Sequence, residues 1–185
     1  VAVHESGHAI VSHVLPHADD VHKVSIVARG SALGYTVLLP EEDRHLHSRA
    51  QLADQLAVAL AGRAAEEVVF GELTTGAADD IDRATRLAQA MVTEYGMSNK
   101  LGPRRFASRD GEPFLGLDHG RAADHGTDVA VRVDEEVSRL LDEAHDRARR
   151  ILESHRGGLD RLAAALLERE TLADAELAEH LSALG

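Results

Sequence analysis

A five-residue segment near the start of the chain has the side chains and spacing of a metal site: His4-Glu5-Ser6-Gly7-His8. On a helix, residues four apart lie about one turn apart on the same face, so His4 and His8 could reach one ion. Glu5 would then lie beside the open coordination position. Zinc lowers the pKa of a bound water to about 7, and a neighbouring carboxylate can take the water's proton as it attacks a carbonyl. The spacing indicates a hydrolytic zinc site, and the alternative is a helix with two surface histidines.

Composition narrows the other possibilities. The 185 residues suit one domain with a sizeable core. Apolar residues are 44% of the chain, and aromatic residues are only 3%. A core of Ala, Leu and Val favours closely packed helices. The chain has no cysteine, so a metal must be held by nitrogen and oxygen. The formal charge of −12 argues against nucleic acid or an anionic membrane surface as a partner.

A third metal ligand must come from elsewhere in the chain, and helical spacing singles out Asp80. Residues 78–95 are typical of an amphipathic helix. Asp80 shares its apolar face, whereas Asp79 lies on its polar face. A carboxylate that points inward needs a partner, and a cation would be suitable.

Glu66 and Glu67 are the alternative third ligands. They lie on an expected helix over residues 48–70, whose Ala- and Leu-rich sequence predicts a central, buried helix. A glutamate from a second helix completes the zinc site in some peptidases. Glu66 could instead accept the other N–H of a ligating histidine.

The fold class predicted from periodicity is mainly α, with a small β-hairpin or sheet near the first helix. We expect helices over residues 1–14, 48–70, 78–95, 127–154, 158–169 and 173–184, strands over 23–28 and 33–40, a turn at 29–32 and an irregular segment over 96–126. Thr171 and Asp174 resemble a capping box for the last helix. The hairpin could offer its edge to an extended substrate, or it could only cover the core.

The other ten histidines are expected to lie outside the site. His13 lies on the opposite side of the first helix from His4, and His17 lies beyond Pro16. His22 is expected to be structural. Seven more lie in predicted loops or on charged helix faces: His45, His47, His119, His125, His145, His155 and His180.

Three segments resemble one known family. They read HESGHAIV from residue 4, VHKVSIVARGSALGYTVLLPEED from residue 21, and AGRAAEEVVFGELTTGAADDIDRATRLAQAMVTEYGMSNKLGP from residue 61. The tail, RARRILESH followed by LAAALLERETL, is also similar. Over nearly its whole length the chain resembles the peptidase domain of the FtsH family, which are ATP-dependent, membrane-anchored zinc metalloproteases of bacteria, mitochondria and chloroplasts.

The resemblance implies roles for individual residues. His4 and His8 would bind one Zn²⁺ per chain, Glu5 would be the general base, and Asp80 would be the third ligand. The sequence departs from the family at Asp79, where asparagine is usual, so a second acid adjoins the ligand.

The resemblance also implies a longer parent protein with a covalently linked AAA ATPase module and a membrane anchor. The chain starts at Val1 and has no run of about 18 apolar residues. We therefore expect residues 1–185 to be one zinc metallopeptidase domain excised from that parent, soluble by itself and located on the cytoplasmic side of the membrane. The implied partners are unfolded or membrane-protein substrates and five further copies in a hexamer.

Two other functions remain open on the sequence. The chain could be a catalytically idle helical domain that holds a ring together, or a self-sufficient small zinc peptidase. Metal content and peptide turnover distinguish the first from an enzyme. The specific match over residues 58–103 counts against the second.

Overall fold

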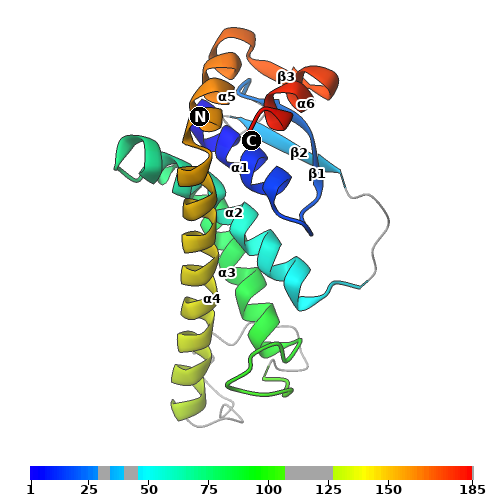
Figure 1. The fold of residues 1–185 in the computed structure, drawn as a ribbon. Coiled ribbons are helices and arrows are strands. Elements are labelled where there is room, and N and C mark those ends of the chain that lie inside the picture. The colour runs from blue at the N-terminus through cyan, green and yellow to red at the C-terminus, as the bar shows by residue number, and fades with distance from the viewer. Residues whose placement is uncertain (29–33, 40–45, 107–126, 185) are drawn as a thin grey trace.

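The computed structural model describes residues 1–28, 34–39, 46–106 and 127–184. Its helices and strands confirm a mainly α protein with a small sheet (Figure 1). The helices are α1 (Ala2–Val14), α2 (Arg49–Phe70), α3 (Ala78–Thr93), α4 (Thr127–Ser154), α5 (Arg156–Arg169) and α6 (Asp174–Ser182), with a 3₁₀ turn η1 (Thr75–Ala77) before α3. The strands are β1 (Asp20–Ser25), β2 (Tyr35–Leu39) and β3 (Thr171–Ala173). Every expected helix is present, with ends that agree within two residues.

Small side chains allow α1 and α2 to pack in direct contact. A Cβ added at Gly7 would lie 2.6 Å from both the Ala61 carbonyl oxygen and the Ala65 Cβ. The alanines of α2 at 57, 61, 64 and 65 have no exposed surface, which confirms the prediction of a buried central helix. Ser48 and Gln51 form a capping box that starts α2, and Gly71 ends the helix in a left-handed conformation.

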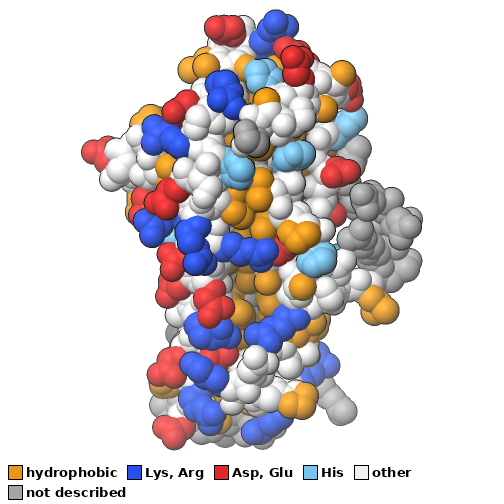
Figure 2. Space-filling model, in the orientation of Figure 1, with side chains coloured by type: hydrophobic (Ala, Val, Ile, Leu, Met, Phe, Trp, Pro, Cys, Tyr) orange, Lys and Arg blue, Asp and Glu red, His pale blue; other side chains and the backbone are white. Residues whose placement is uncertain are grey.

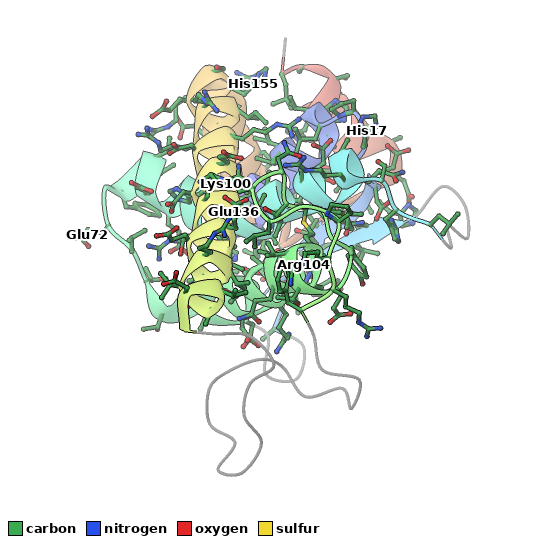
Figure 3. The ribbon with its side chains drawn as sticks, turned by 90° about the horizontal axis from the view of Figure 1, so that it is seen from below. His17, Glu72, Lys100, Arg104, Glu136 and His155 are labelled. Carbon is green, nitrogen blue, oxygen red and sulfur yellow. The ribbon has the colours of Figure 1, made fainter. Side chains whose placement is uncertain are left out.

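The long helix α4 packs along α2 and α3 (Figure 1). Its buried side chains recur every three or four residues, as a core-facing stripe requires: Val133, Val137, Leu140, Ala144, Ala148 and Leu152. Glu136 on the same helix is only 1% exposed and accepts hydrogen bonds from Ser98 and Arg139. Lys100 lies 3.1 Å from the same carboxylate, next to it in Figure 3, so Glu136 ties the segment after α3 to α4.

The sheet is antiparallel, with strand order β2-β1-β3. The pairing of β1 with β2 confirms the predicted hairpin, but the expected bounds of its first strand, 23–28, are wrong. The strand begins at Asp20, opposite Leu39, and ends at Ser25. An irregularity between Val21 and Lys23 lets Asp20 and Val21 join the ladder. The turn at 29–32 and both ends of the second expected strand, Leu33 and Pro40, lie outside the described residues.

The sequence did not predict β3, and the capping box at Thr171 and Asp174 is wrong. Thr171 belongs to β3, where its hydroxyl lies 2.8 Å from the Ser25 hydroxyl. Helix α6 starts after Ala173 without a side-chain cap. Pairing with β1 and complete burial of Leu172 outweigh the local capping pattern, and a strand of three residues is too short to show a period of two.

Acidic and basic side chains are mixed over the face drawn in Figure 2, with apolar side chains visible in a strip between them. The basic residues do not gather into a single patch on this face. Among the described residues, no helix is both long and apolar enough to cross a membrane.

Candidate metal centre

The side chains of His4, His8 and Asp80 meet where the start of α3 approaches α1. The two Nε2 atoms lie 3.1 Å apart, and Asp80 Oδ2 lies 3.0 Å from His4 Nε2 and 3.3 Å from His8 Nε2. Zinc–ligand bonds of about 2.0–2.1 Å in a tetrahedral site place ligand atoms about 3.3 Å apart. The triangle has this size, and two imidazole nitrogens with one carboxylate oxygen form a donor set that zinc accepts. The residues therefore fit a zinc ion.

The expected division between the two neighbouring aspartates is confirmed. Asp79 is exposed, whereas the Asp80 side chain is 24% exposed and in contact with both histidines. The helical spacing of α3 produces this difference, because consecutive residues lie about 100° apart around the helix axis.

The electrostatics of the cluster favour a positive charge between these side chains. Burial opposes protonation of His4, but hydrogen bonds to Asp80 and Glu66 outweigh burial and raise the His4 pKa above its ordinary value of 6.5. Burial would by itself raise the pKa of Asp80, yet the two histidines hold that pKa well below its ordinary 3.8. A proton or a bound metal ion could supply this positive charge.

Helix α2 contacts the opposite nitrogen of each imidazole. His8 Nδ1 lies 2.8 Å from the Val58 carbonyl oxygen, and His4 Nδ1 lies 3.0 Å from Glu66 Oε1. A carbonyl and a carboxylate accept hydrogen bonds, so each Nδ1 carries the proton and donates it. In the neutral imidazoles both Nε2 atoms are then left with a lone pair, which metal ligation requires.

Glu66 therefore lies behind His4 and not among the three clustered side chains. One of its carboxylate oxygens accepts from His4, and the other accepts a 2.9 Å hydrogen bond from the Thr74 hydroxyl. Of the two roles that the sequence leaves open for Glu66, this geometry supports the orientation of a histidine. Glu67 is 3.1 Å from His145 and also lies apart from the cluster.

Glu5 is 8% exposed and lies on α1 between the two histidines in sequence. Its Oε2 accepts a 2.8 Å hydrogen bond from the hydroxyl of Thr36 on β2. The carboxylate is not part of the three-residue cluster. A carboxylate beside a metal site and outside its ligand set is suited to proton transfer.

Sequence reasoning did not identify Thr36, Thr74 or the Val58 carbonyl. All three lie within or next to the segments that carry the family resemblance. Their partners are 31, 8 and 50 residues away in the chain, however, and no local periodicity reveals such contacts.

The remaining described histidines lie outside the metal cluster, as predicted. His17 and His155 are in separate regions of Figure 3. His145 and His155 are less exposed than expected, because His145 contacts Glu67 and His155 Nδ1 lies 2.8 Å from the Leu184 carbonyl oxygen. His22 makes a long contact of 3.6 Å with Asp174. His45, His119 and His125 lie outside the described residues.

Comparisons with known proteins agree on one family. The sequence profile of peptidase family M41 matches residues 1–180. The ATP-dependent zinc metalloprotease FtsH of Kosmotoga olearia is 51% identical over 97% of this chain and 28% of its own length. FtsH of Rubrobacter xylanophilus is 52% identical over 99% of the chain and 28% of its own length, and FtsH 3 of Symbiobacterium thermophilum is 48% identical over 99% and 29%. The chain thus spans less than a third of the length of these relatives.

Proposed function

The chain belongs to peptidase family M41, and from this premise we propose that it is the zinc endopeptidase domain of an FtsH-like protease. The observation that carries the proposal is the triangle of ligand atoms from His4, His8 and Asp80. Buried Glu5, adjacent in sequence to His4, supplies the carboxylate that peptide hydrolysis requires. The zinc metalloprotease names of the relatives support the same metal and reaction.

In this proposal His4, His8 and Asp80 would hold a single zinc ion. When bound, zinc lowers the pKa of a water molecule and polarises the scissile carbonyl. Glu5 accepts the water's proton as the water oxygen bonds to the carbonyl carbon, and it returns the proton to the departing amine. Glu66 and the Val58 carbonyl keep both histidines in the tautomer that can bind metal.

Strand β2 is suited to hold the substrate. It pairs with β1 on one side and, among the described strands, has no partner on its other side. Thr36 on β2 also contacts Glu5, so this strand runs beside the proposed base. An extended peptide that adds to the edge of β2 opposite β1 would lie near the proposed base, which favours the substrate-platform interpretation of the hairpin.

The relatives are named ATP-dependent and are more than three times as long as this chain. We therefore extend the proposal to a parent protein in which this domain is linked to an AAA ATPase module and assembles as a hexamer. A membrane anchor would place it on the cytoplasmic side of the membrane. Unfolded polypeptides, including extracted membrane proteins, are the proposed substrates, because a peptide bond must be in an extended strand to reach such a site.

Substitution of Glu5 by Gln tests the mechanism. The variant should keep near-stoichiometric zinc while hydrolysis of a fluorogenic peptide falls by about 10²–10⁴-fold. Activity that survives the substitution would contradict the assignment of Glu5. A wild-type protein that binds zinc and cleaves neither peptide nor unfolded protein would indicate the idle assembly domain. Cleavage of a stable folded protein without ATP would indicate the self-sufficient peptidase.

A further inference from the structure

Two residues at the start of β2 and just before it, Thr36 and Gly34, lie against the carboxylate of Glu5. The Thr36 hydroxyl lies 2.8 Å from Oε2 and, more weakly, 3.4 Å from the Glu5 backbone carbonyl oxygen. Gly34 lies against Val1 and the other oxygen of Glu5, since a Cβ at that position would be 2.7 Å from Val1 Cγ1, 2.9 Å from Glu5 Oε1 and 3.0 Å from Glu5 Cγ. Residues 34 and 36 are two apart, so in extended chain both face the same side, here towards α1.

These two contacts have different chemical consequences. A hydroxyl that donates to Oε2 restricts the rotation of the carboxylate group and makes Oε2 the weaker proton acceptor of the two oxygens. Gly34 has no side chain, so Oε1 lies in the space that a larger residue would fill. The hydrogen bond from Thr36 matters because Glu5 is only 8% exposed, and a buried carboxylate without a hydrogen-bond donor is costly.

We propose that Thr36 is a positioning residue for peptide hydrolysis, which fixes Glu5 so that Oε1 is the oxygen that exchanges the proton with water. This inference rests on the proposed function, because it assigns a task to the neighbour of the proposed base. Thr36 lies on β2, the strand proposed to pair with the substrate. The backbone that aligns the scissile bond and the hydroxyl that aligns the base therefore belong to one element.

The test compares Thr36→Val and Thr36→Ser with the wild-type protein. Valine keeps the shape and the β-branched side chain but removes the hydroxyl, whereas serine keeps the hydroxyl. We expect Thr36→Val to lower kcat by about 10-fold or more, because misplacement of a reacting group is costly. KM and the zinc dissociation constant, measured by competition with a chelator, should stay within about twofold, since Thr36 contacts no ligand atom. Thr36→Ser should retain most of kcat.

Thr171→Val is the matched control. Thr171 is in the same sheet, and its hydroxyl also lies 2.8 Å from a side-chain oxygen, that of Ser25. The control should leave kcat within about twofold of wild type, because Thr171 does not contact Glu5. Gly34→Ala is a second route to the same result. Its methyl group would press on the Val1 side chain and on Glu5 Oε1 while Thr36 stays intact, and kcat should again fall at unchanged zinc affinity.

Several results would overturn the inference. Thr36→Val with wild-type kcat, Thr36→Ser as impaired as Thr36→Val, or zinc affinity that falls together with kcat would each indicate no role or only a structural one. If Thr36→Val does not fold, the serine and Gly34→Ala variants decide. Failure of the proposed function gives a different pattern, in which the wild type is inactive with zinc bound or Glu5→Gln remains active.

Discussion

Gly62 on α2 lies so close to His4 that a Cβ at residue 62 would overlap the His4 ring at Nε2, the atom that meets His8 and Asp80. Gly62 is one turn after Val58, whose carbonyl contacts His8, and one turn before Glu66, whose carboxylate contacts His4. Three successive turns of one face of α2 therefore contact the two histidines. Val58 accepts a hydrogen bond from His8, Gly62 leaves space for His4, and Glu66 orients His4. The metal centre depends on α2 as much as on α1, which carries the motif.

Substitution of Gly62 by Ala should damage the metal centre without removing any proposed ligand. The added methyl must displace the His4 ring or separate the two helices, so we expect zinc affinity to fall by about 10-fold or more and stability by about 1–3 kcal/mol. Chelator competition and urea unfolding measure the two effects. Gly157→Ala is the control, because its Cβ would meet the Arg161 guanidinium at an ordinary 3.4 Å. Equal zinc affinity in Gly62→Ala and wild type would contradict this account.

Three substitutions, each of which replaces a carboxylate by a neutral amide, should identify the third zinc ligand. Asp80→Asn should lose the most zinc affinity, since a neutral amide is a poor replacement for an anionic ligand. Glu66→Gln should lose about 10–100-fold, because its role is to orient His4. Asp79→Asn should be near neutral. Zinc content after dialysis against a graded chelator series ranks the variants, and loss of zinc in Glu66→Gln with retention in Asp80→Asn would make Glu66 the ligand.

Acid should release the zinc. Both histidines must be neutral to bind metal. Burial lowers the pKa of His4, but the carboxylates beside it outweigh burial and raise that pKa above 6.5, so protons compete with zinc at a higher pH than they would for an ordinary histidine. The affinity should fall steeply as the pH drops from about 7 to 5 and recover when zinc and neutral pH are restored. A metal-sensitive dye reports the released ion. An affinity that is constant over this range would argue against a site of two histidines.

Glu136 should contribute to stability with a distinct pH dependence. Its hydrogen bonds with Arg139, Ser98 and Lys100 outweigh burial and lower its pKa from 4.5 to about 2. A lowered pKa stabilises the folded state above the unfolded value near 4.5, and the contribution disappears as the pH falls towards 2. Glu136→Gln should therefore cost about 3 kcal/mol at pH 7 and progressively less below pH 4.5.

Urea unfolding of wild type and Glu136→Gln at a series of pH values measures this difference. Glu143→Gln is the control, because that carboxylate also pairs with Arg139 but is 61% exposed, and exposed ion pairs contribute little. A penalty for Glu136→Gln that does not change between pH 7 and 3.5 would show that lost packing, and not charge, is responsible.

The sequence by itself determined the features that are encoded within one or two helical turns. The spacing of His4 and His8 placed both on one face of α1, and the apolar period of residues 78–95 turned Asp80 inwards while leaving Asp79 exposed. Six helices and a hairpin followed from the same local periodicities, because a helix period of 3.6 and a strand period of 2 are written in neighbouring residues.

The tertiary structure alone decided what those residues contact. Glu66 and His4 are 62 residues apart, Asp80 and His4 are 76 apart, and Thr36 and Glu5 are 31 apart. Whether Glu66 points at the metal position or at the back of an imidazole depends on how α1 crosses α2, and that crossing is set by the close packing at Gly7 and Gly62. Strand β3 was hidden for the same reason, since three residues carry no period and become a strand only where β1 supplies their hydrogen bonds.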